Sequence, residues 1–281
     1  MPMQRIHIVG SSPRSGTTLL MEMMVNCFEI DLFPAHEARL GKCPPRNGDI
    51  FISKSPKDII IVKKHLRVMK NLHVIFLMRD PRDSAVSKHG VNKEQYYGDL
   101  RYWKRFLPFF EEIKTHPRLV HFRYEDLVND PDRVQEFIAE KIPFLKYREK
   151  FSNFHLHSSP SKNTSLALKG LRKVDASGIG NWRNHKSRIL GQIMTHGSIS
   201  EDLIRYGYEK DEEWLKELDG IEPDLSEGHR MPNYEERFIR AKQRFRYLKA
   251  IRVWFCHTAI FLRSRQRWRA ITGRREQSNG A

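Results

Sequence analysis

Short apolar runs alternate with longer helical patterns over the first half of the chain. Residues 6–9, 50–53, 73–78 and 119–122 are apolar runs typical of strands. The run at 73–78, HVIFLM, is almost continuously apolar, as expected for a strand covered on both faces. Helices are expected over residues 17–28, 57–69, 81–87, 97–115 and 131–140. This alternation predicts a three-layer α/β domain with a mostly parallel sheet.

The first strand leads into a glycine loop, GSSPRSG at residues 10–16, and then into a helix. The free backbone N–H groups at such a helix start, together with the helix dipole, attract anions. This P-loop-type strand-loop-helix unit therefore predicts an anion site. Because parallel sheets bind ligands beyond the carboxyl ends of their strands, we expect one cleft lined by the residues that follow the strand ends. These residues are Gly16, Lys54, Arg79 and Tyr124.

The second half of the chain has a different character. Residues 151–180 are polar and loop-like, and residues 187–215 favour helix with a break around 206–208. The composition changes near Gly220, which predicts an α/β domain over 1–220 and a basic helical extension over 221–281. Within that extension, residues 237–275 contain 13 Lys or Arg and no Asp or Glu, in an amphipathic helical pattern.

The whole chain of 281 residues carries a formal net charge of +16, which favours acidic ligands or surfaces. Its three cysteines are widely spaced, fit no metal pattern and suit a reducing compartment. The sequence starts directly with the first strand, and the longest apolar run is far shorter than the roughly 20 residues of a membrane span. We therefore expect a cytoplasmic protein.

The glycine loop departs from a Walker A loop at its key position. Thr17 stands in place of the Walker lysine, and Arg14 lies two residues before Gly16. The sequence PRSGTT instead resembles the 5′-phosphosulfate loop of sulfotransferases that use 3′-phosphoadenosine 5′-phosphosulfate (PAPS). The arginine is most similar to that of the tyrosylprotein and bacterial branches. A generic phosphate loop is the alternative interpretation.

A second segment, VIFLMRDPRDSAVSKHG, resembles the 3′-phosphate motif of the same family. In that motif an arginine at a strand end and a serine eight residues later bind the 3′-phosphate, and here they are Arg79 and Ser87. A guanidinium fork and a hydroxyl can hold one phosphate from two sides. The alternative is that Arg79 pairs with Asp80 or Asp83 at a helix start.

Smaller matches follow in the family's order over residues 5–210. SKSP places Lys54 where the family's lysine contacts the transferring sulfonate and the bridging oxygen. HFRYEDLVNDP assigns Tyr124 to the adenine nucleotide, and GIGNWRNH places Trp182 near the adenine. Upstream of this tryptophan the family carries Arg-Lys-Gly; here the sequence is RKV, and the resemblance gives Lys173 a 3′-phosphate role.

The resemblance also implies the roles of the remaining site residues. The 5′-phosphate would be held by the backbone N–H groups of Ser15, Gly16, Thr17 and Thr18, with help from the hydroxyls of Thr17 and Thr18. Arg14 and Lys54 would stabilise the negative charge that grows on the bridging oxygen during in-line transfer. No metal is expected.

An acceptor hydroxyl needs a general base, which the resemblance places after the first helix. There the chain reads HEAR at residues 36–39. The tyrosylprotein branch uses a glutamate followed by an arginine, whereas other branches use histidine. We predict Glu37 as the base with His36 as the rival, and Arg39 as a residue that orients the acceptor or the base.

The leading prediction is a PAPS-dependent sulfotransferase that releases 3′,5′-diphosphoadenosine (PAP) and acts on a glycan or glycolipid hydroxyl. A phenol or a peptide tyrosine is the alternative acceptor. A P-loop nucleotide kinase is the alternative enzyme, and a nucleic-acid binder ranks last. The basic tail is expected either to contact a membrane or an acidic polymer, or to pack as a solvated helix.

Overall fold

The computed structural model describes residues 3–35, 37–42, 48–88, 94–168 and 170–229 and, in a C-terminal helix, residues 239–241, 243–245, 247, 248 and 251. His36 and most of the predicted basic segment at 237–275 lie outside the described residues.

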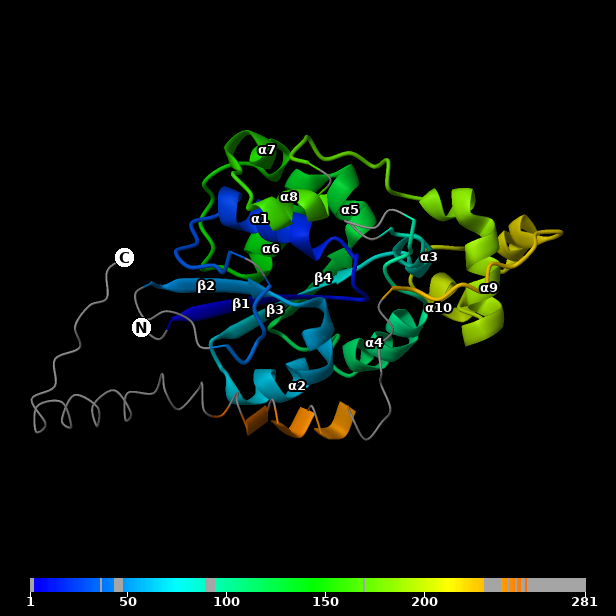
Figure 1. Cartoon of the computed structure of the whole chain (residues 1–281). Coiled ribbons are helices and arrows are strands. Elements are labelled where there is room, and N and C mark those ends of the chain that lie inside the picture. The colour runs from blue at the N-terminus through cyan, green and yellow to red at the C-terminus, as the bar shows by residue number, and fades with distance from the viewer. Residues whose placement is uncertain are drawn as a thin grey trace, which may run out of the picture.

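A sheet of four parallel strands forms the centre of the molecule (Figure 1). The strands are β1 (Gln4–Gly10), β2 (Ile50–Lys54), β3 (Leu72–Met78) and β4 (Leu119–Arg123), in the order β2-β1-β3-β4. The predicted strands and the predicted parallel α/β architecture are confirmed. Lys54 is the last residue of β2 rather than the first residue after it.

Helices cover both faces of this sheet, as Figure 1 shows. One face carries α1 (Thr17–Cys27), α5 (Tyr124–Asn129), α6 (Pro131–Lys141), α7 (Phe154–His157) and α8 (Lys162–Leu168). The other face carries α2 (Ile59–Val68) and α4 (Arg101–Glu111). The alternation along β3 explains the two cores, because Ile75 and Leu77 pack into one and Val74 and Phe76 into the other.

The carboxyl ends of the strands are enclosed by a third group of elements. These are α3 (Pro81–Ala85), α9 (Lys186–His196), α10 (Ser200–Arg205) and the 3₁₀ turns Asn181–His185 and Glu213–Leu218. Two further 3₁₀ turns, Pro56–Asp58 and Phe151–Asn153, precede α2 and α7.

Several predicted helix limits were wrong, for identifiable reasons. The helix expected over 97–115 begins only at Arg101, because the Tyr97 N–H donates to the Ser87 carbonyl, 2.9 Å away, and the Asp99 side chain accepts from the Arg101 N–H. The helix expected to carry Ser87 ends at Ala85. Residues 151–180, predicted to be loop, contain α7 and α8. The helical stretch after 187 has the predicted break after Arg205, and it has a second break at Gly197, whose φ of 83° suits glycine.

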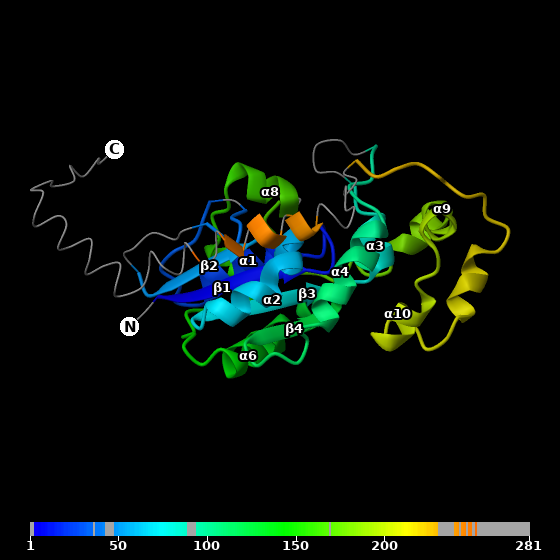
Figure 2. The same ribbon diagram turned by 90° about the horizontal axis from the view of Figure 1, so that it is seen from below.

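The described residues between 239 and 251 are helical and lie along α2, whereas residues 221–229 are not helical (Figures 1 and 2). Ile239 is buried in the core on this face, and the Gln243 side chain donates to the Ile60 carbonyl at 2.8 Å. The predicted domain division at residue 220 stays a prediction. Within the described residues, no helix is long and apolar enough to cross a membrane.

Candidate active site

A cavity of about 830 Å³ opens at the carboxyl ends of the strands. Gly16, Lys54, Arg79 and Tyr124, the four residues that the sequence places at strand ends, all line it. Thr17, Thr18, Ser87 and Lys173 line it as well. The parallel topology therefore brings together side chains that are more than 150 residues apart in sequence.

The loop between β1 and α1 contains two residues with a left-handed backbone conformation. Arg14 and Gly16 have φ angles of 74° and 93°, and no other described non-glycine residue has a positive φ. A Cβ on Gly16 would lie 2.4 Å from the Tyr124 ring, so only glycine fits there. The start of α1 has no side-chain cap, which leaves its first backbone N–H groups available to an anion.

The side chains of Arg14 and Arg79 connect this loop to the segment after β3. Arg79 donates from Nη1 to the Arg14 carbonyl (2.9 Å) and from Nη2 to the Gly178 carbonyl (3.0 Å), while its guanidinium lies 4.4 Å from the centre of the Tyr124 ring. Arg14 donates from Nε to the Ser87 hydroxyl at 3.0 Å. The predicted 5′-phosphosulfate loop and 3′-phosphate motif are thus in direct contact.

No described carboxylate forms an ion pair with Arg14 or Arg79. Burial, and then the charge of Arg79, lower the pKa of Arg14. The alternative pairing of Arg79 with Asp80 or Asp83 is not what the structure shows, because Asp80 binds Arg82 and Asp83 accepts backbone N–H groups. Two half-buried cations without an anionic partner among the described residues favour binding of an anion between them.

Lys54 and Glu37 form an ion pair at another part of the cavity wall. The Nζ–Oε1 distance is 3.2 Å, with the lysine side chain 8% exposed and the glutamate 46% exposed. A carboxylate that is open to the cavity and next to a buried ammonium suits a proton acceptor beside a charge-stabilising group. His36, the rival base, lies outside the described residues.

Two of the predicted binding residues do not line the cavity. Ser15 is a buried residue of the glycine loop, and its hydroxyl has no hydrogen-bond partner among the described residues. Trp182 is fully buried, with the Arg82 guanidinium 4.2 Å and the Arg183 guanidinium 4.5 Å from its ring centre. Since its ring has no surface in the cavity, we leave Trp182 out of the proposed adenine site.

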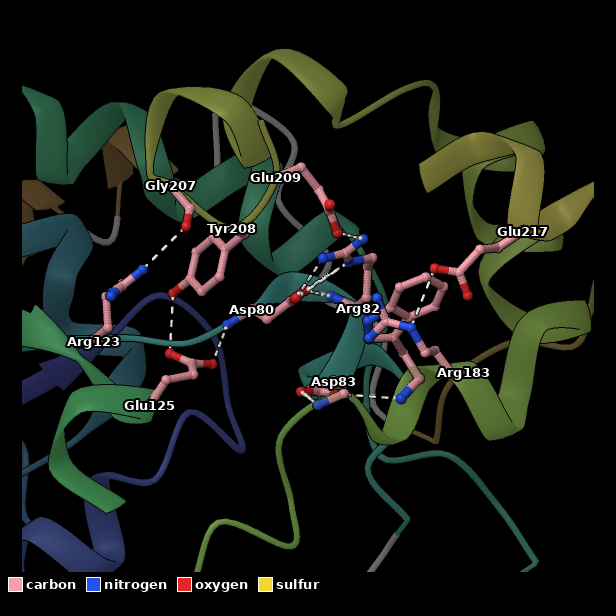
Figure 3. Close-up of polar contacts among 12 residues, drawn as sticks. Asp80, Arg82, Asp83, Arg123, Glu125, Arg183, Gly207, Tyr208, Glu209 and Glu217 are labelled. Atoms are coloured by element: carbon pink, nitrogen blue, oxygen red, sulfur yellow. Dashed lines mark hydrogen bonds and ion pairs between the residues drawn. The ribbon is translucent and has the colours of Figure 1, made fainter. Parts of the chain in front are cut away.

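Trp182 instead packs edge to face on Trp214, and the Arg82 guanidinium lies beside both rings, 4.2 and 4.8 Å from their centres. Arg82 also forms the ion pairs with Asp80 (2.8 Å) and Glu209 (2.6 Å) that Figure 3 shows. We call these five residues the arginine latch. Its contacts connect α3, which follows Arg79, to the segments after residue 180.

The neighbouring acidic residues complete this support. Asp83 accepts the N–H groups of Gly180 (2.8 Å) and Trp182 (2.9 Å). Glu125 accepts the Asp80 N–H at 3.0 Å and is also bound by the Tyr208 hydroxyl. Burial raises the pKa of Glu125 to about 7. These contacts fix the backbone that follows Arg79.

Sequence reasoning missed several residues at the site. Tyr97, Lys88 and His185 line the cavity, and the Arg14 guanidinium lies 5.8 Å from the Tyr97 ring centre. Because the sequence predicts that Tyr97 begins a helix, it gives no reason to expect the Tyr97 side chain in the cavity. Asp80 and Asp83 are the alternative partners of Arg79 in the sequence, but Asp80 pairs with the nearby Arg82. Asp83 accepts from Gly180 and Trp182, and this long-range contact has no local signal in the sequence.

No known family model matches the sequence. The sequence is 25% identical over 230 residues to cytosolic sulfotransferase 3 from Arabidopsis thaliana, which covers 66% of this chain and 72% of that protein. The chain is therefore similar to a sulfotransferase over about two thirds of its length.

Solved sulfotransferase structures are also similar to this one. The sulfotransferase domain from the curacin biosynthetic pathway matches with a TM-score of 0.46 and 16% identity, over 65% of this chain and 91% of that chain. A mouse sulfotransferase in complex with PAP matches with a TM-score of 0.44 and 17% identity, over 65% of this chain and 78% of that chain.

Proposed function

We propose that this protein moves a sulfuryl group from PAPS to a hydroxyl acceptor. The observation that carries the proposal is the joined pair of cationic sites, Arg14 with Ser87 and Arg79 with the loop carbonyl. The 3′-phosphate distinguishes PAPS from ATP, so a site for PAPS needs a second anion-binding site beside the glycine loop. The relationship to a cytosolic sulfotransferase supports the same reading.

The cavity has groups suited to both ends of the nucleotide. The uncapped start of α1 with Thr17 and Thr18 would hold the 5′-phosphate, and Arg79 with Ser87 would hold the 3′-phosphate. The Arg79 Nε is buried without a hydrogen-bond partner among the described residues, as expected of a group that awaits a ligand. Tyr124 would pack on the nucleotide, and Lys173 adds a positive charge to the same wall.

In the transfer step the acceptor oxygen forms a bond to sulfur while the bond between sulfur and the bridging oxygen of PAPS breaks. The acceptor proton passes to Glu37, and the electron pair of the broken bond stays on PAP. Lys54, 3.2 Å from Glu37, stabilises the charge that grows on the bridging oxygen, assisted by Arg14. The protein thus acts mainly by positioning and by electrostatic stabilisation.

For the acceptor we propose a glycan or glycolipid hydroxyl. Leu19, Phe154, Leu166 and Leu168 contribute apolar surface from α1, α7 and α8 to the same cavity as Glu37. An apolar wall near the base favours an acceptor with an apolar part, and of the two classes this favours the glycolipid. Sulfation of a simple phenol or of a peptide tyrosine, with no transfer to glycolipid, would contradict this assignment.

A titration tests the nucleotide assignment directly. Without Mg²⁺, the protein should bind PAP at least tenfold more tightly than ATP, as measured by calorimetry. Arg79→Ala should weaken PAP binding by about 10–100-fold, because a charge-assisted hydrogen bond contributes about 1.5–3 kcal/mol.

Arg67→Ala is a suitable control, since Arg67 is an exposed arginine on α2 that does not line the cavity. Equal affinities for PAP and ATP would reject the PAPS assignment and favour the nucleotide kinase.

We also propose that the C-terminal helix rests on an anionic membrane surface. While Ile239 and Gln243 face α2, Phe245 and Leu248 are 60% and 59% exposed. Arg240 and Arg244 are exposed on the same helix. Apolar side chains flanked by arginines suit the boundary between lipid head groups and acyl chains.

Sedimentation with vesicles tests this contact. The full chain should bind vesicles that contain phosphatidylserine and not those of phosphatidylcholine alone, and Phe245→Gln with Leu248→Gln should abolish binding. Met194→Gln, at an exposed position on α9, is the control. Binding to heparin without binding to vesicles would exclude the membrane in favour of an acidic polymer.

A further inference from the structure

Asp58 is a fully buried carboxylate outside the cavity, at the end of the turn Pro56–Asp58. Its two oxygens bind separate partners on a distant segment. Oδ2 accepts the Leu40 N–H at 2.7 Å, and Oδ1 accepts from Arg39 Nη1 at 3.0 Å. His7 Nε2 lies 3.5 Å from Oδ2, and burial lowers the pKa of His7. Arg39 is therefore the cation that balances this buried charge.

The segment at 37–42 is held from its other side by β1. Arg5 donates from Nη2 to the carbonyl groups of Leu40 (3.0 Å) and Lys42 (3.3 Å). The Leu40 side chain is fully buried. Both backbone polar groups of Leu40 thus have fixed partners, one on Asp58 and one on Arg5.

The same two segments also meet inside the cavity. Lys54 precedes the turn that carries Asp58, and Glu37 precedes Arg39 and Leu40. Lys54 Nζ contacts Glu37 Oε1 at one point, and Asp58 binds Arg39 and Leu40 at the other. Arg39 Nη1 also lies 3.3 Å from the Ser55 hydroxyl, between these two points. Two tethers between two short segments restrict how far one can shift against the other.

We propose that Asp58, acting through Arg39 and Leu40, is a positioning residue that holds Glu37 beside Lys54 for proton transfer. The proposal rests on the proposed function, in which Glu37 is the base. It also gives Arg39 a role: the guanidinium does not line the cavity, so it orients the base segment rather than the acceptor. Because displacement of a reacting group by about 1 Å can cost 10²-fold in rate, a loosened tether would be visible in kcat.

Arg39 offers the cleanest test, because its side chain is 52% exposed whereas Asp58 is fully buried. Arg39→Ala should lower kcat for sulfuryl transfer by about tenfold and leave the Kd for PAP within about twofold, since the change displaces the base and spares the nucleotide site. Arg39→Lys should recover part of the loss, and Arg67→Ala should change neither constant. Unchanged kcat in Arg39→Ala, or an equal loss of PAP affinity, would overturn the proposal.

A double-mutant comparison shows whether the effect passes through the base. In a Glu37→Gln background, Arg39→Ala should cause no further loss of kcat, because the group it positions is already removed. If the reductions in kcat from Arg39→Ala and Glu37→Gln multiply in the double variant, Arg39→Ala has a general structural effect. That result would overturn the positioning role. Undiminished transfer in Glu37→Gln would show that Glu37 is not the base, and this would also overturn the positioning role. PAP titration of the unmodified protein tests the nucleotide function separately.

Hydrogen exchange reports on the tether without any activity. The Leu40 amide should exchange at least tenfold faster in Asp58→Asn than in the unmodified protein, while amides in β3 keep their rates. Arg39→Ala serves as the second variant should Asp58→Asn not fold. Unchanged exchange at Leu40 in the folded variants would show that Asp58 does not hold the segment.

Discussion

Glu37→Gln is expected to reduce kcat for sulfuryl transfer by about 10²–10⁴-fold, the usual contribution of a positioned general base. The substitution keeps the size of the side chain and an oxygen that can accept from Lys54, and it removes the ability to take the acceptor proton. Because Glu37 lies on the segment after α1 and not on the glycine loop, the Kd for PAP should change little. Single-turnover kinetics together with PAP titration would separate the two effects.

Glu140→Gln provides a matched control, because Glu140 is an exposed residue of α6 that pairs with Lys141. Its rate should equal that of the unmodified protein. A Glu37→Gln enzyme that stays active while His36→Gln loses transfer would assign the base to His36 instead.

Arg82→Ala is expected to lower the free energy of unfolding by about 3–5 kcal/mol, because it leaves a buried ion-pair network with unpaired carboxylates. Asp80 and Glu209 would each lose their cation, and Trp182 and Trp214 would lose the guanidinium that lies against both rings. Urea unfolding followed by tryptophan fluorescence measures the change. PAP affinity should fall as well, since the arginine latch supports the backbone next to Arg79.

Arg183→Ala is the informative comparison. Arg183 lies against the same Trp182 ring and pairs with Glu217 at 3.2 Å, but half of its side chain is exposed. An exposed pair of this kind contributes at most about 1 kcal/mol. Similar small losses for both variants would show that burial of Arg82 has no special energetic consequence.

The sheet was predictable because its signals are local. Each strand is a short apolar run, and the topology then requires the residues at the strand ends to share a cavity. Lys54, Arg79 and Tyr124 were located in this way from sequence alone. Helix limits were less predictable where long-range hydrogen bonds compete with helix formation, as at Tyr97, whose N–H is bound by the Ser87 carbonyl.

The supporting contacts could not be read from the sequence for a related reason. Arg82 and Glu209 are 127 positions apart, and each resembles an ordinary surface charge in its local context. Asp58 likewise looked like a helix-start residue, and its partners are set by the path of residues 37–42. The adenine role of Trp182 is predicted from a family resemblance alone, and in this structure its ring is fully buried and does not line the cavity.

The two walls of the cavity are built from different kinds of structure. The phosphate-facing wall is formed by strand ends and the loop after β1, where Gly16 cannot be replaced without a collision with Tyr124. The wall with apolar side chains comes from α7, α8 and the start of α1, and α7 and α8 have four and seven residues. Leu166 and Leu168 of α8 are not part of the core, so we expect that their composition can change without disturbing the sheet, whereas Phe154 of α7 is buried in the core. Under the proposed function, donor recognition and acceptor choice would then depend on different parts of the fold.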